Sequence, residues 1–285
     1  MSISRCLICN KNTIQEYASR NSYDYYKCDN CGFLFADLYT RKNEIENRYN
    51  REFFFSRYHP EKSLKKEKMA QRDNQYLLDR DYIMRFVNNG NLLDYGCGNG
   101  RFLSSFPDSF SKYGYEVNSE ATKFNIKENK FTVIDNFDYL VSMEDNFFET
   151  IVMRGVIEHI VNIEEVISVL SKNLKKGGYF YICATPNADS PCALIYGLDW
   201  GLAKPGHITF FSPRTLSILF SKFNMVLMDC SFPYLGTPYE NYEDDARKFT
   251  EDTYKYLNGS CDSVEPYSSP PFPGSLMSLV FKKIA

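Results

Sequence analysis

The sequence has no long apolar segment, no surplus of one charge and no apolar leader. Its apolar runs stay well below the about 18 residues that a membrane-spanning helix needs, which excludes a membrane span. Lysine and arginine number 33 and aspartate and glutamate 36, a formal net charge of −3. No overall basic field therefore favours nucleic acid as a partner. The first residues do not form the apolar core of a signal peptide, so we expect a cytoplasmic protein.

Histidine and tryptophan are also scarce, with three and one among 285 residues. A reaction that needs a side chain titrating near neutral pH therefore depends on few candidates. Cysteine is frequent, but the number is odd, nine, and five of these cysteines are scattered along the chain. This pattern fits reduced thiols better than a disulfide framework. The chain is long enough for one large domain, or for one domain and a small module.

Two Cys-x-x-Cys pairs stand near the N-terminus. The first is Cys6 and Cys9, the second Cys28 and Cys31, with eighteen residues between the pairs. This spacing is typical of a tetrahedral four-thiolate zinc site. Since protein would fill all four positions, we expect the Zn2+ to be structural and to supply folding energy. Two disulfides or unpaired core thiols are the alternatives.

Three glycines at alternate positions follow an apolar segment that ends in Asp94. The pattern predicts a strand, a tight turn and the start of a helix. Glycine allows a positive φ and lets a ligand lie against bare main chain. The free N–H groups at the start of the helix suit a carboxylate or a phosphate. The dinucleotide fingerprint G-x-G-x-x-G is not met, because Arg101 stands at its last position.

The string Leu-Asp-Tyr-Gly-Cys-Gly-Asn-Gly, residues 93–100, closely resembles motif I of class I S-adenosylmethionine (SAM) methyltransferases. The resemblance implies an α/β, Rossmann-like sheet of seven strands in the order 3-2-1-4-5-7-6, with strand 7 antiparallel. It also implies that SAM is the cofactor and that Asp94 and the glycine loop hold its methionine part. The loop residues expected to bind SAM are Gly96, Cys97, Gly98 and Gly100.

Three further residues are expected at the cofactor. Glu116 ends a predicted strand about twenty residues after the glycines, where nucleotide-binding folds hold ribose hydroxyls. The resemblance implies the same role toward SAM, and it places Asp135, after a third short strand, beside the adenine. Arg154 lies at the carboxyl end of a fourth strand. Ligands bind at that edge of an open α/β sheet.

The predicted catalytic residues are Glu158, His159 and His207. Methyl transfer to a hydroxyl requires an aligned acceptor and a base, and histidine suits the second task. Some related O-methyltransferases, including ubiquinone-pathway and small-RNA enzymes, hold a divalent metal with Glu-x-x-Glu-His and a later histidine. Here Gly155 replaces the first glutamate, which weakens the case for a catalytic metal. Alternatively, Glu158 and His159 hold SAM or cap a helix, and His207 is structural.

The domain organisation follows from these patterns. We predict a zinc ribbon over residues 1–40, a connecting aromatic segment and helix over 41–90, and a SAM-methyltransferase domain over 91–285. A long insert, residues 235–273, is expected to be a lid or a subunit contact. The amino-acid sequence of residues 32–37 and 49–54 is similar to that of zinc-ribbon methyltransferases of sugar and surface-polysaccharide biosynthesis.

The resemblance implies SAM-dependent O-methylation of a sugar or sugar substituent, on a small-molecule or sugar-linked acceptor. N- or C-methylation of a nucleotide sugar remains open. A nucleic-acid-modifying enzyme or RNA-binding module and a SAM-binding scaffold without turnover also remain. The sequence does not fix the oligomeric state.

Overall fold

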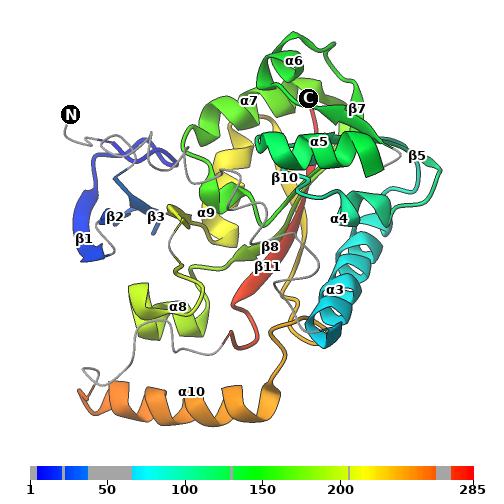
Figure 1. Cartoon of the computed structure of the whole chain (residues 1–285). Helices are drawn as coiled ribbons and strands as arrows, with labels where there is room; N and C mark the ends of the chain where they lie inside the picture. The colour runs from blue at the N-terminus through cyan, green and yellow to red at the C-terminus, as the bar shows by residue number, and fades with distance from the viewer. Residues whose placement is uncertain (1–4, 21–22, 38–65, 129–130, 205, 261–270) are drawn as a thin grey trace.

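The protein is described by a computed structural model that covers residues 5–20, 23–37, 66–128, 131–204, 206–260 and 271–285. Residues 41–65 of the predicted connecting segment lie outside these ranges. The described chain forms a four-stranded and a seven-stranded sheet with helices packed around them (Figure 1).

The seven-stranded sheet forms the body of the molecule. Its order is β10-β11-β8-β7-β4-β5-β6, in which β11 runs antiparallel to both neighbours and the other pairs are parallel. In chain order this is 6-7-5-4-1-2-3, so the predicted strand order and Rossmann-like class are confirmed. The strands are β4 (Gly90–Tyr95), β5 (Phe110–Tyr115), β6 (Thr132–Ile134), β7 (Phe148–Arg154), β8 (Leu174–Pro186), β10 (Met225–Ser231) and β11 (Leu276–Lys283).

Helices cover both faces of this sheet. Neighbouring strand residues point to opposite faces, so Leu92 packs with residues of α3 and α4 while Leu93 packs with residues of α7 and α9. Burial on both faces explains why the strands read as nearly continuous apolar runs. The helices are α3 (Lys66–Met84), α4 (Arg101–Ser104), α5 (Ser119–Glu128), α6 (Phe137–Ser142), η1 (Ile157–His159), α7 (Ile163–Asn173), α8 (Pro191–Tyr196), η2 (Gly197–Asp199), α9 (Pro213–Ser221) and α10 (Tyr242–Leu257).

The small sheet joins the N-terminal segment to a segment from the second half of the chain. Its order is β1-β2-β3-β9, with β1 (Ile14–Arg20), β2 (Tyr23–Cys28), β3 (Leu34–Ala36) and β9 (Thr209–Phe210). β1 and β2 form an antiparallel hairpin between the two cysteine pairs, but β9 comes from the second half of the chain. The rings of Phe33 and Phe211 lie 5.1 Å apart, within the core cluster that also fills one face of the large sheet. The N-terminal ribbon is thus packed onto the body, and its boundary at residue 40 stays a prediction.

The insert at 235–273 contains α10, which lies along one end of the molecule (Figure 1). Tyr196 of α8 donates to Asp252 at 2.7 Å, and the Phe249 and Phe272 rings stack at 5.2 Å. At its start, Gly236 accepts a hydrogen bond from Asn74 of α3 at 2.8 Å. The insert therefore touches both α8 and α3. Its role as a lid or subunit contact stays a prediction.

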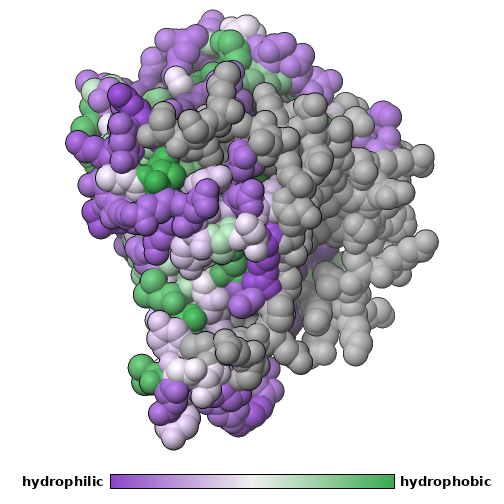
Figure 2. All heavy atoms as spheres, turned by 90° about the vertical axis from the view of Figure 1, so that its left-hand side faces the viewer, coloured by the Kyte–Doolittle hydropathy of each residue, from purple (hydrophilic) through white to green (hydrophobic). Residues whose placement is uncertain are grey.

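The face on the ribbon side is mostly hydrophilic where it is described, with apolar side chains in small separate groups (Figure 2). Leu194 and Tyr17 are examples of exposed apolar residues in the described part of the chain, at 64% and 42% exposure. Singly exposed apolar side chains are ordinary on a protein surface. Among the described helices, none is both long enough and apolar enough to cross a bilayer.

Candidate active site

The glycine loop links β4 to α4 and lies against the end of β5. Gly96 and Gly98 have φ values of 86° and 55°, in the left-handed region that favours glycine. A Cβ on Gly96 would lie 2.6 Å from a methyl group of Val156, so no side chain fits there. The N–H groups of Gly96 and Cys97 both donate to the Tyr115 carbonyl, at 2.8 and 3.0 Å. These bonds hold the loop in a fixed conformation.

Asp94 is a buried carboxylic acid at the end of β4, with 2% exposure. Its Oδ1 atom finds no hydrogen-bond partner within the described part of the chain. Burial raises the pKa of Asp94 to about 7; the Arg154 charge opposes this rise and the Glu116 charge adds to it. The group therefore changes its ionisation near neutral pH. An unsatisfied buried carboxylate is suited to bind a cationic group of a ligand.

Glu116 follows β5 directly and lies against the glycine loop. Its Oε2 accepts from the Gly98 N–H and its Oε1 from the Asn118 N–H, both at 2.9 Å. Burial raises the pKa of Glu116, although both hydrogen bonds oppose the rise. Each carboxylate oxygen has a second acceptor site. The structure therefore places this acid beside the loop with capacity to accept hydrogen bonds from hydroxyl groups. Its expected contact with the ribose stays a prediction.

Arg154 is held by an acid that the sequence reasoning did not identify. Its Nε donates to Asp79 of α3 at 2.7 Å, and its guanidinium lies 4.5 Å from the Tyr76 ring centre. Burial lowers the pKa of Arg154, but the charge of Asp79, its hydrogen bond and the nearby Tyr76 together outweigh the effect of burial, and the net shift is upward. In the sequence, Asp79 is one of many charges in a weakly amphipathic helix, so nothing there marked it as buried.

Asp135 differs from the buried acids Asp94 and Glu116 in its surroundings. It is exposed directly after β6, next to Asn136, whose side chain caps α6 by accepting from the Asp138 N–H at 2.9 Å. The structure thus leaves Asp135 outside the buried group of charges around Asp94. Its expected contact with adenine stays a prediction.

Glu158, His159 and His207 come together although almost fifty residues separate the pair from the third. One ligand atom from each lies within 4.8 Å of the others, and the two imidazole ring centres are 4.8 Å apart. The link is a backbone bond from the Ile208 N–H to the Glu158 carbonyl, 2.9 Å long. The sequence-predicted catalytic residues therefore form one cluster at the carboxyl end of the sheet.

Hydrogen bonds define what this cluster can do. The His159 Nδ1 lies 2.7 Å from the Gly206 carbonyl, which can only accept, so a proton is on Nδ1, and in the neutral imidazole Nε2 carries the lone pair. Glu158 is 3% exposed and accepts from the Thr185 hydroxyl at 3.2 Å. Gly155 has a φ of 61°, a conformation that a glutamate would adopt only with strain. The cluster can accept a proton or hold a cation with three side chains.

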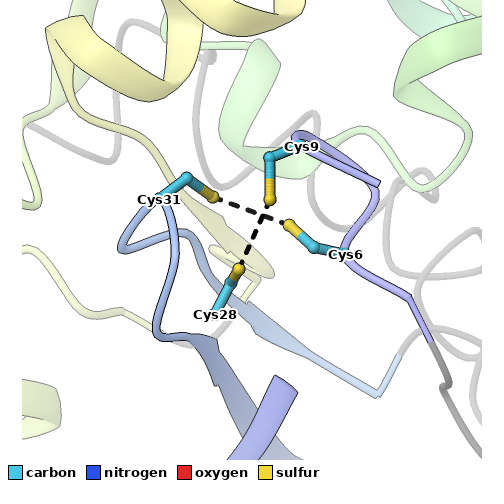
Figure 3. Close-up of side chains that lie close together, drawn as sticks. All are labelled: Cys6, Cys9, Cys28 and Cys31. Carbon is cyan, nitrogen blue, oxygen red and sulfur yellow. Dashed lines mark hydrogen bonds between the residues drawn. The ribbon is translucent and has the colours of Figure 1, made fainter. Parts of the chain in front are cut away.

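The four N-terminal cysteines point toward one another (Figure 3). The sulfurs of Cys6 and Cys31 are 3.6 Å apart, and those of Cys9 and Cys28 3.5 Å. Both distances far exceed the about 2.05 Å of a disulfide, and all four thiols are free. They are close to the about 3.8 Å between sulfurs that a tetrahedral zinc with about 2.3 Å bonds requires. The cluster can therefore hold a metal ion.

The fold and the buried loop geometry define a class I SAM-dependent methyltransferase domain. The chain matches the family model of a methyltransferase domain over residues 68–228, more than half its length, and it belongs to that family. A search of curated proteins found no match.

Solved structures with the same fold include a SAM-dependent methyltransferase from Archaeoglobus fulgidus, with 22% identity, a TM-score of 0.51, and coverage of 73% of this chain and 94% of that one. A SAM-dependent methyltransferase from Thermotoga maritima has 18% identity, a TM-score of 0.53, and coverage of 81% and 98%. A chain in the Haloferax volcanii complex of the Trm112 methyltransferase activator with a methyltransferase has 11% identity, a TM-score of 0.54, and coverage of 77% and 94%. At these identities the likeness concerns the fold.

The raised pKa of Asp94 makes a prediction about the free protein. A carboxyl group has a pKa of about 3.9 when unfolded, and Asp94 has about 7 when folded. The folded state therefore holds the extra proton between these values, and the stability that the group contributes is lost as pH rises through 7. We expect Asp94→Asn to flatten the fall in stability between pH 5 and 8, by about 3 kcal/mol at most.

Urea denaturation of both proteins across this pH range, without ligand, measures the difference. Asp81→Asn, on the exposed face of α3, is the control and should follow the unmodified protein. Parallel pH profiles for Asp94→Asn and the unmodified protein would show that Asp94 does not titrate there.

Proposed function

We propose that the protein is a SAM-dependent O-methyltransferase that acts on a sugar or sugar substituent in surface-polysaccharide assembly. The observation that carries the proposal is the convergence of Glu158, His159 and His207 beside the carboxyl end of the sheet. A hydroxyl acceptor must lose a proton on methylation, and this cluster offers imidazole nitrogens for it. The sugar class rests on the resemblance of the ribbon and the segment after it. A cytoplasmic location stays a prediction.

The residues of the glycine loop fit SAM in charge and shape. The unsatisfied Asp94 carboxylate suits the ammonium of the methionine part, and Glu116 suits the ribose hydroxyls. At Gly96 and Gly98 the surface of the glycine loop carries no side chain, so the ligand can lie against the main chain. Asp135 remains assigned to the adenine. When bound, SAM supplies a methyl group already activated on a sulfonium.

In the mechanism that we propose, the chain aligns the acceptor and removes its proton. His207 takes the hydroxyl proton, and His159, fixed by Gly206, lies next to it as an orienting group. Glu158 is buried and stabilises positive charge on the imidazole pair. Such general-base help is worth about 10²- to 10⁴-fold in rate.

An amine or a carbon acceptor is the alternative, on a nucleotide sugar. A neutral amine already carries its lone pair and needs less help from a base, so a histidine pair favours the hydroxyl. The same three side chains can also hold a divalent metal with open positions, as catalytic metal sites do. A nucleic-acid substrate is disfavoured by the net charge of −3.

We also propose that the cysteine cluster binds one structural Zn2+. Its thiolates would occupy all four positions of the metal, which leaves no place for substrate. The ribbon is hydrogen-bonded to the residue that follows His207, because the Ala36 N–H donates to the Ile208 carbonyl at 2.8 Å. The expected role of the metal is therefore to hold β3, and through it the loop that carries His207.

The His207→Ala variant tests the catalytic proposal. We expect turnover to fall about 10²- to 10⁴-fold while the affinity for S-adenosylhomocysteine, the product form of the cofactor, is unchanged. S-adenosylhomocysteine release on a panel of sugars and nucleotide sugars measures turnover, and calorimetry measures affinity. Turnover equal to that of the unmodified enzyme would remove His207 as the base. Loss of activity with a chelator, while the ribbon metal is retained, would instead favour a catalytic metal.

Elemental analysis tests the zinc proposal. The purified protein should hold one zinc per chain, and Cys28→Ser should lose it and melt at a lower temperature, because metal binding contributes to folding. Cys230→Ser changes a half-buried cysteine of β10 and should keep the metal. A metal-free protein with unchanged melting would contradict the proposal.

A further inference from the structure

Several buried polar atoms near α3 and the carboxyl ends of β4 and β7 have no hydrogen-bond partner among the described residues. Gln75 has no solvent exposure, yet its Nε2 finds no acceptor within the described residues. The Nη2 atom of Arg154 is likewise buried without a partner there. Together with Oδ1 of Asp94, the region contains two donors and one acceptor that protein atoms do not satisfy. Buried polar groups are nearly always hydrogen-bonded, so such a group of exceptions requires an explanation.

The geometry shows which end of each side chain is available. Arg72 Nη1 donates to Gln75 Oε1 at 3.4 Å, and since a guanidinium can only donate, the amide oxygen faces Arg72. The amide nitrogen is then the end left for another group. Asp79 similarly accepts from the Nε of Arg154, and Nη2 of the same guanidinium keeps donor capacity that no described residue uses.

These side chains belong to one neighbourhood. Gln75 and Asp79 are four residues apart on α3 and therefore lie on the same face of the helix. The guanidinium of Arg154 lies over Tyr76, the residue next to Gln75. Strands β4 and β7 are paired with Asp94 opposite Val152, so Arg154 follows two residues beyond that register. The Arg154 charge also acts on Asp94.

The chemistry of the three atoms is complementary to an α-amino acid. A carboxylate accepts hydrogen bonds from two donors, and charge-assisted bonds to an arginine are among the strongest in proteins. An ammonium donates to a carboxylate. We propose that Gln75 Nε2 and Arg154 Nη2 bind the carboxylate of the methionine part of SAM while Asp94 accepts from its ammonium. The inference rests on the proposed SAM binding and assigns α3, which precedes the glycine loop, to the cofactor site.

Two ligands that differ only in the carboxylate test the inference. S-adenosylhomocysteine carries it, and decarboxylated S-adenosylhomocysteine does not. The unmodified protein should prefer the first by about tenfold to a hundredfold, the range for hydrogen bonds to a charged group. In Gln75→Glu, the side chain keeps its size and its acceptor toward Arg72 but presents a carboxylate in place of the donor. We expect this preference to fall to about one or below.

A third ligand, 5′-methylthioadenosine, lacks the whole amino-acid part. Its affinity should be the same in Gln75→Glu, in Gln75→Met and in the unmodified protein, which shows that the adenosine part of the site is intact. Asp81→Asn, on the exposed side of the same helix, should keep the full preference. Calorimetric titration of all four proteins with the three ligands gives the comparison.

The outcomes separate the inference from the proposed function. If Gln75→Glu and Gln75→Met keep the preference for the carboxylate ligand, Gln75 does not bind it and the inference is wrong. If the unmodified protein binds neither S-adenosylhomocysteine nor 5′-methylthioadenosine, the proposed SAM binding itself fails. A preference lost in both variants with 5′-methylthioadenosine binding unchanged supports the inference.

Discussion

The short pairing of β3 with β9 is the constraint on which the arrangement of the active site depends. It aligns Leu34 with Phe210 and Phe35 with Thr209, and so fixes the residues that directly follow His207. A continuous series of backbone bonds runs from Ala36 to Ile208 and from Ile208 to Glu158. The N-terminal ribbon, the His207 loop and η1 are therefore one hydrogen-bonded unit. The large sheet supplies the second support, since the ribbon and one face of that sheet share a core.

The cofactor side of the site depends on a different principle, the burial of charge without full compensation. Asp94 and Glu116 both have raised pKa values because water is excluded from them. The Arg154 charge offsets part of that cost at Asp94. Polar groups that a protein leaves unsatisfied in its free state are available to a ligand that matches them. The family of the chain and this pattern of buried charges therefore both favour SAM as the cofactor.

Much of the fold could be predicted from the sequence because the signals were local. The glycine loop after an apolar strand and the acid that follows β5 are each defined by a few neighbouring residues. The spacing of the Cys-x-x-Cys pairs likewise predicted that the four cysteines come together, and their sulfur atoms lie within 4.8 Å of one another. Contacts between distant segments could not be predicted this way. The pairing of β9 with the ribbon and the burial of Gln75 and Asp79 arise only when remote elements pack, and a two-residue strand has no pattern of its own.

Amide hydrogen exchange with and without the proposed ribbon metal tests whether the ribbon holds the proposed catalytic cluster of Glu158, His159 and His207 in place. The account predicts that metal removal increases exchange at residues 206–211 and 157–160 as well as in the ribbon, while β4 stays protected. Faster exchange confined to the ribbon, with 206–211 and 157–160 unchanged, would contradict it.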